Sequence, residues 1–169
     1  MQLHTVIQIK ESDVRRFLTL SATHVLAVAV GFALGVYFLP ILTAPASPDQ
    51  AMLAQESQDA MYVGVLTRDL RGSDFLHWGE GKISISAQTI VHEGTLAPGP
   101  DYKLYLVKEF VEHEDEFEPL KAQAQFIADI KTFNGAVVNV PDGVDVSDYT
   151  TVVVWCESFG EFITSAQYQ

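Results

Sequence analysis

The hydrophobic residues of this chain lie in one long block that is followed by many short runs. Residues 17–42 contain no Asp, Glu, Lys or Arg, and they come directly after Arg15 and Arg16. A helix of about 26 residues is roughly 39 Å long, which is enough to cross a hydrocarbon core of about 30 Å with some tilt. The pattern therefore predicts a single transmembrane helix over residues 17–42.

The two arginines before the block predict its orientation. Because Arg15 and Arg16 stand at the N-terminal end, the positive-inside rule places residues 1–16 in the cytoplasm as a short tail. The rest of the chain is then on the far side of the membrane. We therefore expect a bacterial-type protein of the inner membrane, crossing once, with its C-terminal domain in the periplasm or outside the cell.

A cleaved signal peptide is the alternative interpretation of the same block. Ala44 and Ala46 form a small-x-small pattern before Ser47, as a signal peptidase requires. However, the apolar region of a signal peptide has about 7–15 residues, and Pro45 stands where the peptidase needs an extended, unhindered chain. Both features favour an uncleaved anchor.

After the helix the pattern changes twice. Residues 43–60 are rich in Ala, Pro, Ser, Gln and Asp, and they predict a linker with room for one helical turn around Met52. Residues 61–169 alternate short apolar runs with Gly, Pro and Asp, which is typical of short strands joined by turns. The predicted strands cover residues 61–66, 81–86, 89–94, 102–107, 124–130, 136–140 and 150–156.

Two of these runs indicate how the strands are buried. In 81–86, Ile83 and Ile85 alternate with polar residues, which predicts one buried face. The run 150–156 is apolar on both faces, so it should be a central strand covered on both sides. No later segment keeps a helical period for long. The fold class we predict is all-β, a β-sandwich or barrel of short antiparallel strands over residues 61–169, preceded by the transmembrane helix.

Charge narrows the classes of partner. The formal net charge is −12, and residues 1–42 hold three basic and two acidic residues, so the excess of acid belongs to the part after the helix. Such a surface repels a phosphate backbone, and this excludes DNA or RNA binding. It favours a cationic or positively charged partner.

Few chemical motifs are present. Cys156 is the only cysteine, so neither an intrachain disulfide nor a multi-thiolate zinc site can form. The acidic run 109–118 lacks the spacing of a calcium loop, and we expect it to be a solvated, mobile loop without a metal. No nucleophile elbow or phosphate-cradling glycine loop occurs, and we predict that the protein is not an enzyme.

The C-terminal half carries an ordered series of short motifs. They are Gly94-Thr95, Gly99-Pro100-Asp101, Tyr105-Leu106, Ile127 to Lys131 before Asn134-Gly135, Pro141 with Asp145, Ser147 and Tyr149, the run Val152 to Cys156, and Phe159-Gly160, with His77 and Gly81 at the opening strand. In this order, over roughly residues 72–169, the chain resembles the DM-thirteen family, also called the electron-transfer DM domain.

The resemblance implies a function. In that family the cysteine after the tryptophan is the signature residue, and the domain occurs beside haem-binding and b-type cytochrome modules. It implies a redox or electron-transfer accessory centred on Cys156, acting through the free thiol or by ligating a haem or another prosthetic group, with a membrane redox protein as partner. Trp155, His77, Tyr105 and Asp145 are the candidate supporting residues.

The chain departs from the family pattern in two places. One is the acidic insertion 109–118, and the other is Glu157, where a basic residue is often found. An acidic neighbour disfavours a thiolate, so Glu157 counts against a reactive Cys156.

Two interpretations of Cys156 stay open at this point. On a strand it shares a face with Val152 and Val154, so it can be a small packed core residue. A lone thiol in an oxidising compartment is otherwise a liability, kept because something oxidises or binds it. The corresponding functions are a membrane-anchored redox accessory and a cofactor-free binding module that presents an acidic β-domain to a protein or cell-envelope partner.

Overall fold

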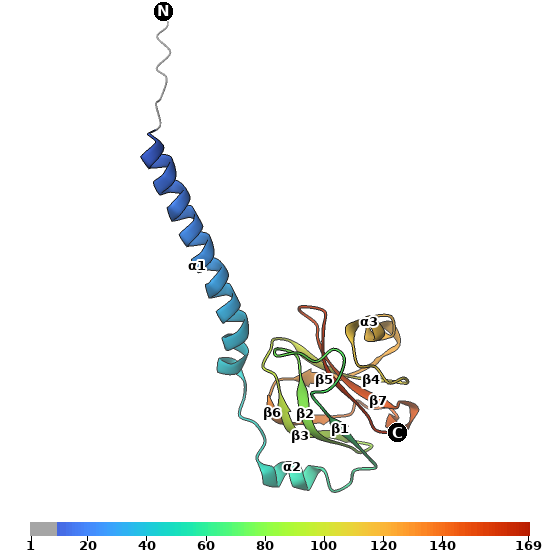
Figure 1. The fold of residues 1–169 in the computed structure, drawn as a ribbon. Helices are drawn as coiled ribbons and strands as arrows, with labels where there is room; N and C mark the ends of the chain where they lie inside the picture. Colours follow the sequence, from blue (N-terminus) through green and yellow to red (C-terminus); the bar gives the residue numbers. More distant parts are fainter. Residues whose placement is uncertain (1–9) are drawn as a thin grey trace, which may run out of the picture.

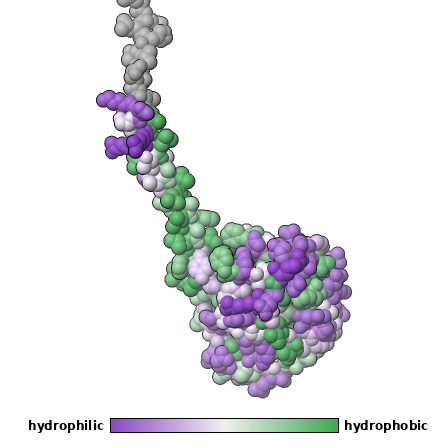
Figure 2. Space-filling model, viewed as in Figure 1, coloured by the Kyte–Doolittle hydropathy of each residue, from purple (hydrophilic) through white to green (hydrophobic). Residues whose placement is uncertain are grey.

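The chain forms one long N-terminal helix and a two-sheet β-domain (Figure 1). The computed structural model describes residues 10–169, so most of the predicted cytoplasmic tail lies outside the described residues. Helix α1 spans Glu11–Thr43 and contains the whole predicted segment 17–42. Within the described part of the chain it is the one helix long and apolar enough to cross a membrane. Figure 2 shows its hydrophobic surface running down to the junction with the domain.

A second helix, α2 (Gln50–Glu56), lies in the predicted linker. The carboxylate of Asp49 caps it by accepting the N–H of Met52 at 2.8 Å, which confirms the helical turn around Met52. Leu53 is only 1% exposed, and α2 packs against β3 (Thr89–Leu96) and β6 (Asn134–Asn139). Residues 50–56 are therefore part of the packed domain.

In residues 10–169, eight antiparallel strands form two four-stranded sheets, which confirms the all-β sandwich preceded by a single long helix. The first sheet has the order β1-β2-β3-β6, where β1 is Tyr62–Leu66 and β2 is Gly79–Ile85. The second has the order β5-β4-β7-β8, with bounds Gln125–Ile130, Tyr102–Val107, Thr151–Cys156 and Glu161–Gln167. As predicted, β7 is central and every residue in it is buried.

The last strand, β8, was not among the predicted strands. Its inward and outward faces are both buried, yet it carries Thr164 and Ser165, which are 0% and 1% exposed. The Ser165 hydroxyl offsets the cost of its own burial by donating to the Val111 carbonyl at 2.5 Å, whereas the Thr164 hydroxyl has no hydrogen-bond partner among the described residues. The polar residues interrupt the apolar run, so the sequence pattern alone does not indicate a buried strand.

Two hydrophobic clusters hold the domain together. The first fills the space between the sheets and includes Cys156. The second lies on the outer face of β4 and β7, beneath the segment that contains helix α3 (Glu114–Phe117) and the 3-10 turn η1 (Lys121–Gln123). Its centre is Phe117, whose ring packs 5.0 Å from that of Trp155, measured between centroids.

The prediction of a solvated, mobile loop over residues 109–118 is therefore wrong. Val111 and Phe117 are 1% and 0% exposed. The carboxylates stay at the surface, where Arg71 pairs with Asp115 and Glu116 at 2.8 and 2.7 Å. The segment is anchored because two apolar side chains outweigh the repulsion of exposed, partly paired charges.

The C-terminal part of helix α1 lies beside the domain. It runs beside the end of the sandwich where the β3–β4 turn and the β7–β8 hairpin lie (Figure 1). This end of the domain contains Cys156.

Candidate functional site around Cys156

Cys156 is the last residue of β7 and is 3% exposed. It faces the core with Val152 and Val154, as the strand period predicts. Its neighbours across the sheet are Tyr102 in β4 and Glu161 in β8. The thiol donates a hydrogen bond to the carbonyl oxygen of Pro100, with Sγ 3.0 Å from that oxygen.

The surroundings of Cys156 favour the neutral thiol. Burial raises its pKa above the ordinary value, and the charges of Asp101 and Glu161 act in the same direction. The backbone N–H groups of Phe159 and Ser158 act against this, but they do not reverse it. Because the thiolate is the form that acts as nucleophile and metal ligand, Cys156 is a weak nucleophile and a weak metal ligand in this conformation.

Glu157 is not the acid responsible for this shift. Its carboxylate lies on the other side of the sheet, where Lys121 Nζ is 2.6 Å away and the Tyr105 hydroxyl donates to it. Partial burial tends to raise the pKa of Glu157, but these two hydrogen bonds lower it overall. Lys121, which follows the acidic insertion, thus supplies a positive charge beside Glu157.

A hollow of about 480 Å³ lies between α1 and this end of the domain. Cys156, His77 and Tyr102 are its polar lining from the domain, and none of the described residues around it is Asp, Glu, Lys or Arg. The apolar part of the wall comes from residues 32–34, 36 and 37 of α1 and from Leu76, Pro98, Pro100, Phe159 and Ile163. The thiol is therefore buried by the domain but borders an apolar space shared with the long helix.

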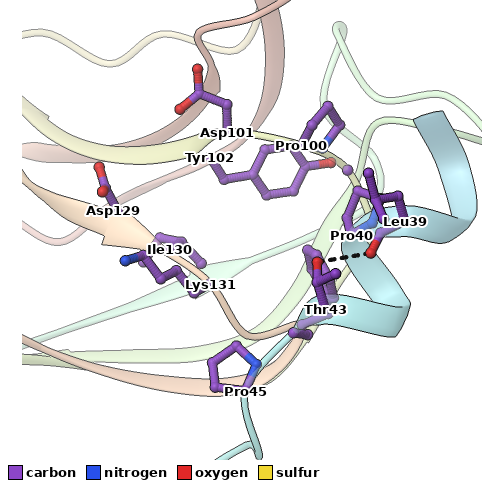
Figure 3. A pocket seen from close by; sticks show the side chains of 13 residues that line it. Leu39, Pro40, Thr43, Pro45, Pro100, Asp101, Tyr102, Asp129, Ile130 and Lys131 are labelled. Carbon is purple, nitrogen blue, oxygen red and sulfur yellow. Dashed lines mark hydrogen bonds between the residues drawn. The ribbon is translucent and has the colours of Figure 1, made fainter. Parts of the chain in front are cut away.

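A second hollow of about 350 Å³ adjoins the first on the other side of Pro100 and Tyr102 (Figure 3). It lies between the end of α1, with Leu39 and Pro40, and the start of β4 beside the end of β5. Its rim is charged, because Lys103 Nζ bridges Asp129 at 2.8 Å and Asp101 at 3.2 Å beside it. This polar rim distinguishes it from the hollow at Cys156.

Tyr102 separates the two hollows. The side chain is 2% exposed, burial raises its pKa, and its ring packs over Gly99. A Cβ at Gly99 would lie 2.7 Å from Cζ of Tyr102, so only glycine fits in this turn. Gly99 was therefore a signal in the sequence for a close approach, although the partner could not be read from it.

His77 is the one predicted supporting residue that borders the same hollow as Cys156. Its Nδ1 lies 3.1 Å from a carboxylate oxygen of Asp74, and the other oxygen of Asp74 accepts the N–H groups of Leu76 and His77. Burial tends to raise the pKa of Asp74, but these backbone bonds and His77 lower it. The ionised carboxylate thus orients the imidazole.

The structure does not bring the other three predicted residues to Cys156. Trp155 and Tyr105 belong to the cluster on the opposite face of the sheet. Asp145 lies beyond the other end of β7, where it caps the turn η2 (Val146–Asp148) by accepting the N–H and hydroxyl of Ser147 at 2.9 and 2.6 Å. The residues that sequence reasoning missed are Tyr102, Pro100, Leu76 and Phe159.

The surroundings of Cys156 do not fit a haem or a metal ion bound through its sulfur. A thiolate ligand must be deprotonated and accessible, whereas this thiol is protonated, 3% exposed and bonded to Pro100. The hollow offers no Lys or Arg among the described residues for a cofactor's carboxylates. Over residues 10–169, no three His, Cys, Asp or Glu side chains gather as a metal site.

Comparisons with known proteins agree with the resemblance in the sequence. The family described as Electron transfer DM13 matches residues 72–168, which is more than half of the chain. Searches of curated proteins and of solved structures gave no match. The matched range begins just before the loop of His77 and ends with Tyr168, so it contains every strand of the sandwich except β1. The chain therefore belongs to the electron transfer DM13 family.

Proposed function

We propose that this protein is an electron-transfer accessory anchored in a bacterial inner membrane by α1, with its β-domain outside the cytoplasm. Cys156 is the residue that meets the electron carrier. The observation that carries the proposal is the shared hollow: the sole cysteine borders an apolar space whose other wall is α1, a helix long and apolar enough to cross a membrane. Family membership supports a role in electron transfer.

The chemistry at Cys156 follows from its protonation. A neutral thiol that is buried and hydrogen-bonded reacts slowly with disulfides and other electrophiles in water, because the thiolate is scarce. Random oxidation outside the cytoplasm is thereby suppressed. With one cysteine in the chain, oxidation of Cys156 cannot give an intrachain disulfide. Transfer of two electrons and release of two protons to the oxidised carrier joins Cys156 Sγ to a partner's thiol sulfur as a mixed disulfide, or to a water oxygen as a sulfenic acid.

The oxidation state of Cys156 in native membranes tests this role. Membranes that contain the full chain are poised oxidised or reduced, denatured, and alkylated, and the alkylated fraction of Cys156 is measured by mass spectrometry. We expect that fraction to differ by at least about threefold between the two conditions, with reversal on re-reduction. A thiol that stays fully reduced in both conditions would count against a redox role.

A second function is favoured by the burial of the thiol itself. If Cys156 is only a packed core residue, the domain is a binding module that presents its acidic surface to a protein or envelope partner. In that case a Cys156→Ser variant keeps full activity in cells. A Cys156→Ser variant that folds but loses activity excludes this second function.

A further inference from the structure

Two loop tips beside α1 carry exposed hydrophobic side chains. Phe75 is 85% exposed, Leu76 is 40% exposed, and Phe159 at the tip of the β7–β8 hairpin is 52% exposed. Leu76 and Phe159 line the Cys156 hollow together with α1. Both loops lie on the side of the domain along which α1 rises (Figure 1). Apolar tips that gather next to a membrane helix are typical of a surface that meets the bilayer.

Three backbone N–H groups of the loop that carries Phe75 and Leu76 are paired within the loop. The Asp74 carboxylate accepts the N–H groups of Leu76 and His77 at 2.6 and 2.7 Å, and the Asp74 N–H donates to the His77 carbonyl at 2.9 Å. A backbone whose hydrogen bonds are made internally loses little when water is removed. These pairings reduce the cost of bringing the tip to an apolar interface, and its two large side chains gain from the contact.

The length of α1 places these tips at the edge of the hydrocarbon. A core of about 30 Å takes about 20 helical residues, so a span that begins at Phe17, directly after the arginines, ends near Val36. Leu76 and Phe159 border the same hollow as residues 32–37 of α1. The tips are thus level with the outer boundary of the apolar core.

The charge of the domain indicates how such contact is made. The part after α1 is strongly acidic, so anionic lipid headgroups repel it. The hollow at Cys156, by contrast, has no charged Asp, Glu, Lys or Arg among its described lining residues. Contact with the bilayer therefore depends on apolar insertion and does not need anionic lipid.

We infer that the β-domain docks on the adjacent leaflet of the bilayer through Phe75, Leu76 and Phe159, so that the hollow beside Cys156 opens to the hydrocarbon and not to water. This inference rests on the membrane anchoring in the proposed function. It narrows the electron carrier to one that is soluble in the lipid, because such a molecule reaches the thiol without crossing an aqueous layer.

The test uses the full chain in phosphatidylcholine vesicles. In a Cys156→Ser background, Phe75→Cys is labelled with a polarity-sensitive fluorophore, and quenching by lipids with a nitroxide near the headgroup is measured. The matched control is Val63→Cys, a site 54% exposed on β1, outside the loops that line the hollow. We expect quenching at position 75 to exceed that at position 63 by at least about threefold.

A third label separates failure of this inference from failure of the anchoring. Phe32→Cys lies within α1 and is strongly quenched if α1 spans the bilayer. Strong quenching at 32 with equal, weak quenching at 63 and 75 overturns the docking and leaves the anchoring intact. No quenching at 32 overturns both.

A loss-of-contact variant excludes insertion driven by the fluorophore. Leu76→Ser combined with Phe159→Ser in the protein labelled at position 75 should reduce quenching by at least about half, because two of the three apolar contacts are removed. Val65→Ser, at a 63% exposed site on β1, is the control and should leave quenching unchanged. Undiminished quenching in the double variant contradicts docking through these side chains.

Discussion

Replacement of Leu53 by alanine tests whether α2 belongs to the folded domain. Leu53 is the buried residue of this seven-residue helix and is 1% exposed. Its side chain fills the space beside Gly135, where an added Cβ would lie 2.8 Å from Leu53 Cδ1. A free tether would tolerate Leu53→Ala, whereas a packed element would not.

The expected loss of stability follows from this burial. Moving a buried leucine side chain into water costs about 1.5–3 kcal/mol, and the cavity left by truncation raises the usual total for Leu→Ala to about 2–5 kcal/mol. A short helix at the edge of the domain can settle partly into the space. We therefore expect the free energy of unfolding to fall by about 3 kcal/mol.

Urea unfolding of the full chain in detergent micelles, followed by near-ultraviolet circular dichroism, measures this change. With a slope of about 1–2 kcal/mol per molar urea, the midpoint should fall by roughly 1.5–3 M. Met52→Ala is the matched control, because Met52 is on the same helix but 47% exposed, and its effect should stay within about 0.5 kcal/mol. Equal effects of the two substitutions would refute the packing of α2.

Three further predictions concern the same domain and the same unfolding assay. Burial lowers the pKa of His92 from its ordinary 6.5, so the imidazole stays neutral in the folded chain. Its contribution to stability is full above about pH 6.5 and is lost at lower pH, because the imidazole takes up a proton in the unfolded chain. His92→Gln keeps a donor for the Glu80 carbonyl, 3.0 Å from Nε2, and should reduce the loss of stability between about pH 7 and pH 5; an unchanged loss would assign it to other groups. Phe117→Ala should lower the free energy of unfolding by about 3–5 kcal/mol, whereas Phe110→Ala, at a 44% exposed site, should lower it by less than about 0.5 kcal/mol. Similar small values for both variants would indicate that residues 109–118 form a mobile loop after all. Gly135→Ala should cost at least about 1 kcal/mol because its φ of +83° suits glycine, and a neutral result would contradict that strain.

The local pattern of the sequence determined the fold class and most of the elements. The long uncharged block predicted a long helix outside the β-domain. The seven alternating or apolar runs correspond to β1–β7, with ends shifted by a few residues. These features depend on residues near each other in the chain, so they can be read without knowledge of the tertiary contacts. The side of β7 on which Cys156 lies follows from the same period of two.

Only the tertiary structure decided the surroundings of Cys156. The carbonyl that accepts its proton is 56 residues away, and the apolar wall of its hollow comes from α1 and from two separate loops. Likewise, Leu53 is buried because Gly135 leaves room for it, and the acidic segment is anchored because Phe117 meets Trp155. Such contacts join segments far apart in sequence, and no local period encodes them. For this reason the sequence could identify the cysteine and its family, while the three-dimensional packing determined that it is a neutral thiol beside an apolar hollow.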